Sequence, residues 1–403
     1  MSRYTEEKII LCTSQLHVSE HHKVLLESML MSDSIDWNYV LERTLEEGTT
    51  GLVYKTIKGM GNNYLSKIPC ADAFSTVYSE TIFRNTLLFE EFKKVLDAFE
   101  GHRIPVILLR GYVMIQTIYK DPGLRPLDDI DILIRKEDVL TISDILFRSG
   151  YRSPPSYPLL FIKDGAMIDV HLDLAGSSRI QSRRFGYNEE AAQWWQHCKK
   201  FLIPPADKSF TVQDSSYEHI FVLDTHDFVI TSAVHLLKHS FGRLIWFVDI
   251  KEMLEYERPH FDWKSFRGRI EFLCMQKPLY YSLKYIHVLY GVSVPPSLLE
   301  DFGKELNVFE KLIMRMLLNH KKVYRWGDIV FLFSIENLKE RVKYLVETYF
   351  PRREVISQIF GISHPALIYF FYIFRFWQVI FIGSRECTRL LLQVISLFCR
   401  LRK

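Results

Sequence analysis

Three aspartates stand close together in the segment LRPLDDIDILI, which begins at Leu124. Its apolar end is typical of a buried β-strand. Because side chains alternate between the two faces of a strand, Asp129 and Asp131 are predicted to share one face, opposite the isoleucines. Asp128 then faces the other way or belongs to the preceding loop. The segment therefore predicts a pair of carboxylates at the start of a strand.

A second strand is predicted in MIDVHLDL, where Asp169, His171 and Asp173 alternate with apolar residues. If the two strands are neighbours, Asp129, Asp131 and Asp169 converge, and buried like charges are costly without a counter-ion. Oxygen ligands favour Mg²⁺ or Mn²⁺ over zinc, and three carboxylates suit a pair of metals as used for displacement at phosphorus. The alternative is a solvated strand start, which is common for any DxD taken alone.

A strand, a glycine and a helix are predicted upstream, in RIPVILLRG followed by YVMIQTIYK. Gly111 at the end of the strand would let the following amide groups approach a phosphate at a helix N-terminus. Arg110 and Arg125 are candidates to neutralise triphosphate oxygens. For Arg125 the alternative is a salt bridge to Asp128.

The elements that position these residues form a small α/β unit within a helical protein. Helical periodicity dominates residues 1–100, where Asp36 is a candidate helix start, and returns from about residue 226. Within residues 104–174, Asp164-Gly165 predicts a tight hairpin turn between two strands. The predicted fold class is α+β, a small mixed sheet between mainly helical regions. The predicted division is a helical region 1–100, a core 101–205, a helical domain 206–350 and C-terminal helices 351–403.

Composition limits the classes of function. The 403 residues are 48% hydrophobic, which supports packed cores, and a formal net charge of +3 gives no overall reason to expect a nucleic-acid partner. Six cysteines without a CxxC pair or zinc-ligand spacing predict reduced thiols in a cytosolic protein. The N-terminal residues lack the layout of a secretory signal, so a cytoplasmic location is expected.

The C-terminal stretch ALIYFFYIFRFWQVIFIG is strongly apolar but contains Arg375 and Gln378. It falls short of the ~20 uninterrupted apolar residues of a spanning helix. The residues that follow predict an amphipathic helix with a basic stripe, in which Arg385, Arg389, Gln393, Ser396 and Arg400 lie opposite Leu391, Val394, Ile395, Phe398 and Leu401. A terminal helix packed on the protein is favoured; a helix on an anionic membrane surface is the alternative.

The segments LLRGYVMIQTIY, GLRPLDDIDILI and MIDVHLDL together resemble the polymerase-beta-like nucleotidyltransferase superfamily. Within it, the chain is most similar to a bacterial group of uncharacterised nucleotidyltransferases. The resemblance includes IDWNYVLERTLEEGTTGLVYKTI, AVHLLKHSFGRLIWFVDI, and YFPRREVISQIFG with YIFRFW, and so extends over most of the chain. It implies that Asp129 and Asp131 hold metal ions, that Asp169 completes the site, and that Asp169 also orients or deprotonates an acceptor hydroxyl.

Two residues depart from the pattern that the resemblance implies. The residue after the phosphate-loop glycine is usually small, often serine, but here it is Tyr112, which leaves only a backbone amide as donor. The closer group commonly has lysine where this chain has Arg110.

Further along, His235 and His239 in HLLKH lack the glutamate of a metalloprotease motif. In one interpretation these histidines pack within the protein. In the other, which the resemblance implies, Lys238 or His239 lies over the nucleotide.

The leading hypothesis is a nucleotidyltransferase that uses Mg²⁺ or Mn²⁺ to move a nucleoside monophosphate from a triphosphate to an acceptor, releasing pyrophosphate. The alternative is a non-catalytic nucleotide-binding or regulatory protein, for which Tyr112 is the best support. The acceptor, whether a small molecule, a glycan or a protein, is not readable from the sequence. The nearly neutral charge disfavours a nucleic-acid partner. Peripheral membrane contact through the C-terminal helix would fit a lipid-linked or polysaccharide substrate.

Overall fold

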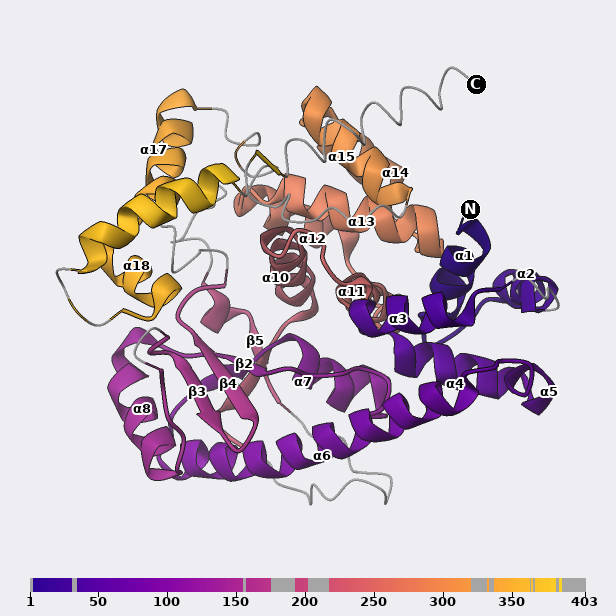
Figure 1. Cartoon of the computed structure of the whole chain (residues 1–403), viewed down its shortest axis with the longest axis horizontal. Helices are drawn as coiled ribbons and strands as arrows, with labels where there is room; N and C mark the ends of the chain where they lie inside the picture. Colours follow the sequence, from indigo (N-terminus) through magenta and orange to yellow (C-terminus); the bar gives the residue numbers. More distant parts are fainter. Residues whose placement is uncertain are drawn as a thin grey trace.

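The computed structural model describes residues 3–30, 35–154, 157–174, 193–201, 217–319, 332, 337–362, 364, 367–381 and 384–385. Within these ranges a single β-sheet lies among helices that come before and after it in the sequence (Figure 1). This arrangement confirms the predicted α+β class.

The sheet of the described residues has six strands in the order β3-β4-β2-β1-β6-β5. The strands are β1 (Val106–Leu108), β2 (Ile130–Leu133), β3 (Leu160–Lys163), β4 (Ala166–His171), β5 (Cys198–Lys200) and β6 (Ile220–Leu223). β2 pairs with β4, and β1 with β6, in parallel; the remaining pairs are antiparallel. The sheet is therefore mixed, as predicted. The sequence pattern predicts β1 to β4 but neither β5 nor β6, and β6 lies beyond residue 205, where the core is predicted to end.

The predicted hairpin is formed by β3 and β4. Asp164 and Gly165 both have positive φ, 48° and 85°, the conformation that a two-residue hairpin turn of this kind requires. Burial alternates along β4, so that Ile168 is buried and Asp169 is partly exposed. The alternation predicted from the sequence is thus confirmed, and it fixes which side chains of β4 can reach the functional face.

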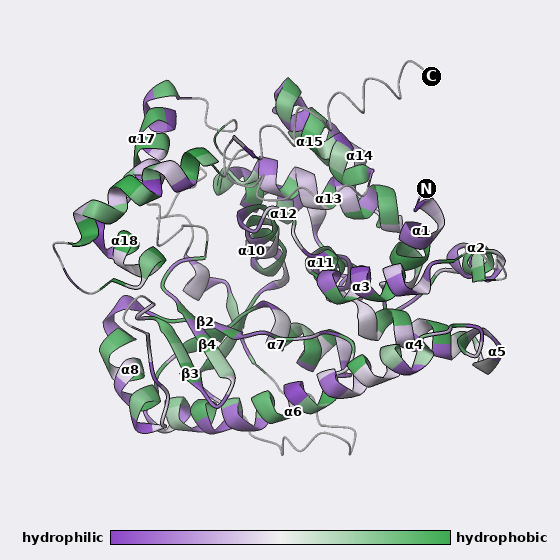
Figure 2. Cartoon of the chain, in the orientation of Figure 1, coloured by the Kyte–Doolittle hydropathy of each residue, from purple (hydrophilic) through white to green (hydrophobic). Residues whose placement is uncertain are grey.

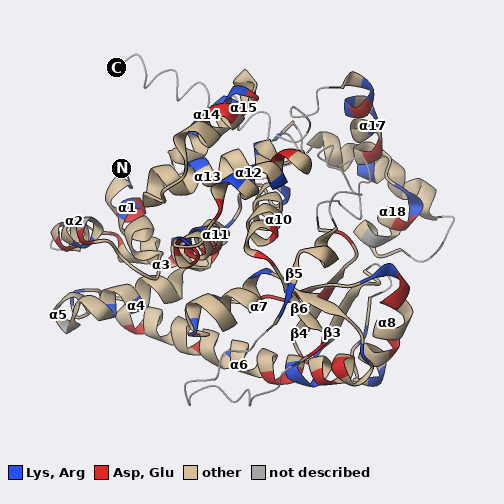
Figure 3. Ribbon diagram, turned by 180° about the vertical axis from the view of Figure 1, so that it is seen from behind, with Lys and Arg blue, Asp and Glu red and all other residues tan. Residues whose placement is uncertain are grey.

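The N-terminal part of the described chain is helical: α1 (Tyr4–Thr13), α2 (Glu20–Leu30), α3 (Trp37–Glu47), α4 (Thr50–Met60), α5 (Asn62–Leu65) and α6 (Ala71–Gly101). Asp36 begins α3 as predicted, because its side chain accepts a hydrogen bond from the amide of Tyr39 at 3.0 Å. α6 runs beside the sheet with Phe92, Leu96 and Phe99 buried, and Figure 3 shows charged residues along it.

Most of the remaining helices follow the sheet strands or lie between them. They are α7 (Arg110–Met114), a π-helical turn η1 (Ile115–Tyr119), a 3₁₀ turn η2 (Lys136–Asp138), α8 (Val139–Arg148), η3 (Trp194–Gln196), α10 (Thr225–Lys238), α11 (Leu244–Tyr256), α12 (Trp263–Phe272), α13 (Gln276–Tyr290), α14 (Pro296–Lys304), α15 (Val308–Leu318), α17 (Leu338–Tyr349) and α18 (Arg353–Phe360). Several begin with a cap; Asp224, for example, accepts a hydrogen bond from the amide of Asp227. α10, α11 and α13 pack on one another, and α10 and α11 lie between α13 and the sheet region (Figure 1).

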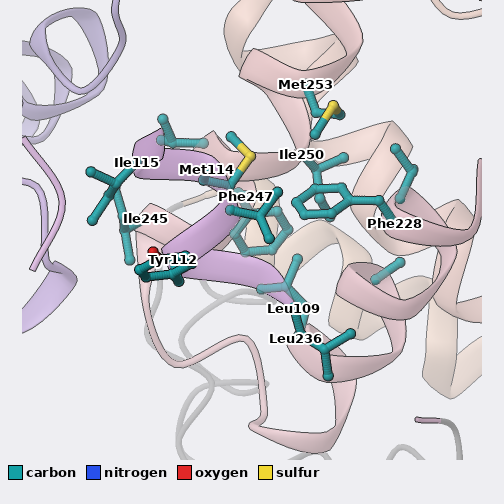
Figure 4. Close-up of a cluster of buried hydrophobic side chains, with 14 of the residues drawn as sticks. Leu109, Tyr112, Met114, Ile115, Phe228, Leu236, Ile245, Phe247, Ile250 and Met253 are labelled. Carbon is teal, nitrogen blue, oxygen red and sulfur yellow. The ribbon is translucent and has the colours of Figure 1, made fainter. Parts of the chain in front are cut away.

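A hydrophobic cluster joins the sheet to these helices. Apolar side chains of α7, α10 and α11 meet there (Figure 4), among them Leu109, Met114, Leu236, Phe247 and Ile250. Colouring by hydropathy shows green segments in the strands and on the inner sides of the helices (Figure 2). Because this packing fixes α10 and α11 against α7, residues far apart in the sequence are held at one pocket.

A helix over residues 367–381 follows α18. The predicted amphipathic helix lies almost entirely outside the described residues: Arg385 is described, whereas Arg389, Gln393, Ser396 and Arg400 are not. None of the helices described is both long enough and apolar enough to cross a membrane.

Candidate active site

Asp131 and Asp169 lie side by side because β2 and β4 are parallel neighbours that pair these two residues in register. Asp129 directly precedes β2, and all three aspartates line one pocket with a volume of about 220 Å³. The two strands therefore present a common carboxylate face, as the alternation in the sequence predicts.

The pocket is built from α7, the loop before β2, β4, α10 and the start of α11. It is lined by Arg110, Gly111, Tyr112, Arg125, Pro126, Leu127, Asp128, Asp129, Asp131, Asp169, His171, His235, Lys238, His239, Arg243, Ile245 and Trp246. All the residues predicted for the metal and nucleotide sites are among them. Sequence reasoning did not assign a role to His171, Arg243 or Trp246.

Asp131 is the best-partnered carboxylate of the pocket. Its Oδ1 forms an ion pair with Arg110 Nη1 at 2.9 Å and lies 2.6 Å from His171 Nε2. Burial acts to raise the pKa of Asp131, but Arg110 and His171 outweigh it and hold this pKa well below its ordinary value. Asp131 is therefore ionised throughout the physiological range.

The pKa values of Asp129 and Asp169 are raised, in contrast to that of Asp131. Burial, together with the charges of Asp131 and Asp169, raises the pKa of Asp129 to about 7. Burial also raises the pKa of Asp169, and the charge of Asp131 adds to the effect. Crowded carboxylates of this kind favour a bound cation, and a carboxylate with a raised pKa is a better proton acceptor than an ordinary one.

Asp131, Asp169 and His171 each offer a ligand atom, and these atoms lie within 4.8 Å of one another. This set differs from the predicted set of Asp129, Asp131 and Asp169, because it contains the imidazole of His171 in place of the Asp129 carboxylate. His171 stands two residues after Asp169 on the same face of β4, so strand alternation was the signal that could have identified it. Carboxylate oxygens with one imidazole nitrogen fit a divalent cation such as Mg²⁺ or, more readily, Mn²⁺.

Arg110 reaches Asp131 from an unusual backbone position. It begins α7 with a φ of 45°, in the left-handed region, directly after Leu109 in extended conformation. The residue is only 9% exposed, and its Nε is buried without a hydrogen-bond partner. Such local strain and an unsatisfied donor are often found where a side chain is placed for function.

Gly111 is required by a close approach of Arg125. A Cβ at position 111 would lie 2.1 Å from Arg125 Nη1, well inside contact distance. The predicted reason for this glycine was room for a phosphate; the structure shows that it makes room for a guanidinium. Gly111 nevertheless lines the pocket.

Arg125 pairs with Asp249 of α11, not with Asp128, so the predicted alternative for this arginine is wrong. Its Nε and Nη2 donate to the Asp249 carboxylate at 3.1 and 2.8 Å, and both side chains are buried. Tyr119 also donates to Asp249, at 2.9 Å. Asp128 instead contacts Arg243 Nη1 at 2.6 Å near the surface. The reason is direction: Arg125 points inward to α11, whereas Asp128 points outward.

Tyr112 belongs to the hydrophobic core. Its ring is 3% exposed and packs edge-on against Phe89 and Phe92 of α6 with centroid distances of 5.2 and 5.1 Å. Burial raises the pKa of its phenol. The ring is therefore directed into the core, and it does not obstruct the aspartates.

The histidines of α10 form a ring cluster with Trp246. The centroids of His235 and His239 are 4.3 Å apart, and His235 lies 4.8 Å from Trp246. Burial, assisted by the charge of Arg110, holds the pKa of His235 well below its ordinary value. Lys238 lines the same pocket, and its charge acts to lower the pKa of Asp169. His235 and His239 therefore pack on Trp246, as one interpretation of HLLKH predicts. Lys238 and His239 line the pocket, and their position over a nucleotide stays a prediction.

Acidic residues of the strands and basic residues of the helices line one pocket. Carboxylates are ligands that divalent cations prefer, and arginine and lysine side chains are ones that phosphate groups prefer. Residues 33–291 match the model of a protein family described as uncharacterised nucleotidyltransferase. Since the match exceeds half of the chain, the chain belongs to this family. The match ends at Gly291, the C-cap of α13, so YFPRREVISQIFG and YIFRFW lie outside it. No curated protein and no solved structure matches the chain.

Proposed function

We propose that this pocket binds a nucleoside triphosphate with a divalent cation and transfers the nucleoside monophosphate to an acceptor, releasing pyrophosphate. The observation that carries the proposal is the register pair Asp131 and Asp169, with Asp129 beside it, in a single pocket. Arg110 and Lys238 line the same pocket and supply positive charge for the phosphates. Placement in the polymerase-beta-like superfamily is part of the same proposal.

Asp131, Asp169 and His171 would hold the cation, with Asp129 near enough for its pKa to respond to Asp131 and Asp169. A bound Mg²⁺ or Mn²⁺ supplies charge neutralisation at the phosphate oxygens and polarises the phosphorus centre. The ion pair of Asp131 with Arg110 holds its carboxylate in one orientation, which lowers the entropy cost of coordination.

The reaction proposed is an in-line displacement. The acceptor oxygen forms a bond to the α-phosphorus as the bond from that phosphorus to the β-phosphate's bridging oxygen breaks, and pyrophosphate leaves with the bonding electrons. Asp169, whose pKa is raised by burial, takes the proton of an acceptor hydroxyl. Arg110 and Lys238 stabilise the negative charge that develops on the leaving group.

The alternative proposal is a nucleotide-binding protein without turnover. Tyr112 is its main support in the sequence, because the residue removes a hydroxyl that phosphate loops of this kind commonly offer. The burial of the Tyr112 ring against α6 weakens that support, since the pocket is not blocked. Gly111 lines the pocket, and the proposal uses the backbone amides that follow it as phosphate donors.

The acceptor is proposed to be a small molecule, a glycan or a protein, and nucleic acid is disfavoured. The basic residues that line the pocket are few and face the carboxylates, whereas strong nucleic-acid binding needs several cations along an extended surface. A cytoplasmic location, where nucleoside triphosphates are available, remains our prediction from the six cysteines of the sequence, which include no CxxC motif.

The test is a nucleotide screen. Calorimetry with ATP, GTP, CTP and UTP in the presence of Mg²⁺ or Mn²⁺ measures binding, and a pyrophosphate assay with lysate fractions as acceptor source measures turnover. Metal-dependent binding followed by pyrophosphate release is expected. Binding without release from any fraction would support the non-catalytic alternative, and the absence of binding to all four nucleotides would contradict both proposals.

A further inference from the structure

The helix over residues 367–381 is held on the protein by one side only. On that side the ring of Phe371 contacts Phe360 of α18 at a centroid distance of 4.9 Å, and Tyr372 donates to the carbonyl of Pro351 at 2.6 Å. The ring of Phe376 stacks on Phe350. These contacts fix the helix against α17 and α18, so its orientation is defined.

The opposite side is apolar and exposed. Leu367, Phe370, Phe374, Trp377 and Phe381 are 50%, 54%, 52%, 63% and 69% exposed, and we call them the aromatic stripe. They recur at spacings of three and four, so they form one continuous row along the helix. The yellow helix after α18 is accordingly green in Figure 2 and mostly tan in Figure 3. Exposure of this much aromatic surface marks an interaction site.

The charge of the surrounding segment indicates what the stripe meets. Residues 361–403 contain six basic residues and one acidic residue, Glu386, although the whole chain has a net charge of only +3. Arg375, the charged residue of the helix itself, donates to the carbonyl of Thr348 of α17 and to Gln378, on the side of the helix that packs on the protein. Positive charge is therefore concentrated in the part of the chain that carries the stripe.

We propose that the aromatic stripe inserts into the interfacial layer of an anionic lipid bilayer, with the helix parallel to the membrane plane. Trp and other aromatic side chains favour the membrane interface, and nearby basic residues are attracted by anionic head groups. A second copy of the chain is a poorer occupant, because pairing two such segments would bring like charges together. The proposal is independent of the nucleotidyltransferase reaction, and its test does not use turnover.

The test is co-sedimentation of the full-length protein with vesicles of phosphatidylcholine alone and of phosphatidylcholine mixed with phosphatidylglycerol. Binding to the anionic vesicles that weakens at high salt is expected. The double variant Phe374→Ser/Trp377→Ser should bind at least about tenfold more weakly, because two large apolar side chains no longer leave water. Phe83→Ser is the matched control, since Phe83 is 65% exposed on α6, and it should bind as the unaltered protein does.

Circular dichroism and the unfolding midpoint confirm that each variant is folded. Failure of the unaltered protein to bind either kind of vesicle would overturn the proposal, and so would equal binding to both. Equal loss of binding in the Phe83→Ser control would also overturn it. Light scattering tests whether the stripe instead contacts a second copy of the chain. If the unaltered protein is a dimer that does not bind vesicles, and the double variant is a monomer, the stripe is a dimer interface.

Discussion

The three aspartates of the pocket differ in how firmly they hold a proton. Asp131 is shared by Arg110 and His171 and keeps a low pKa, whereas burial and neighbouring carboxylates raise the pKa of Asp129 and Asp169. One carboxylate with a low pKa beside two whose pKa is raised by burial and neighbouring charge is an arrangement that acid–base chemistry at a cation site uses.

The raised pKa of Asp129 predicts a pH dependence of cation binding. Below its pKa of about 7 the Asp129 carboxyl is protonated and must lose the proton to act as an anion, so Mn²⁺ affinity should fall as the pH falls. Titration calorimetry between about pH 5.5 and pH 8 should show a decrease approaching about tenfold per pH unit below 7. In Asp129→Asn this dependence should be reduced. An affinity that is independent of pH in the unaltered protein would contradict the assignment.

Gly111 offers a second prediction at the scale of one residue. Gly111→Ala places a methyl group 2.1 Å from Arg125 Nη1 and separates the guanidinium from Asp249, so we expect a loss of about 3–5 kcal/mol of unfolding free energy. Gly268→Ala in α12 is the control, because a Cβ there meets nothing within 4 Å. Denaturant unfolding should show the control unchanged or up to about 1 kcal/mol more stable. Equal stability of the two variants would refute the close approach.

At the scale of elements, the buried pair of Arg125 and Asp249 ties the loop before β2 to α11. Asp249→Ala leaves the Arg125 charge buried without its partner, which should cost about 3–5 kcal/mol of unfolding free energy. Asp128→Ala breaks the exposed contact with Arg243 and should cost less than about 1 kcal/mol. Chemical denaturation of both variants measures the difference. If Asp249→Ala were as stable as Asp128→Ala, the pair would not hold these elements together.

Local patterns in the sequence predicted the elements that carry the carboxylates. Alternation in DIDILI and MIDVHLDL, with the turn at Asp164-Gly165, is sufficient to place Asp129, Asp131 and Asp169 on one face. β5 was missed because Cys198–Lys200 is three residues long and contains two lysines. β6 was missed because a four-residue apolar run directly before α10 has no period that distinguishes strand from helix.

The partners of the arginines were not predictable in the same way. Arg125 and Asp249 are 124 residues apart, and their contact depends on how α11 packs against α7. The same holds for Arg243 and Asp128, which are 115 residues apart. Sequence spacing within one strand or helix carries no information on such pairs. The position of His171, in contrast, is predictable from the alternation of side chains along β4, because His171 shares a face with Asp169.

At the scale of the whole molecule, the pocket lies where the sheet meets α10 and α11, and the family match covers these elements but ends at α13. The helices after residue 291, which include the aromatic stripe, are an addition to the part that the family model describes. The chemistry and the proposed membrane contact therefore reside in different parts of the chain, and each can be altered without the other.

The central claim is that the aspartates of β2 and β4 carry out metal-dependent nucleotidyl transfer. The most direct measurement is the initial rate of Mg²⁺- or Mn²⁺-dependent pyrophosphate release by the unaltered protein and by Asp131→Asn, Asp169→Asn and Asp128→Asn. Asp128 is the matched control, because it lies in the same acidic run and contacts Arg243 at the surface. We expect losses of about 100-fold or more for the first two variants and a near-normal rate for Asp128→Asn. Rates for Asp131→Asn and Asp169→Asn equal to that of the unaltered protein would contradict the account.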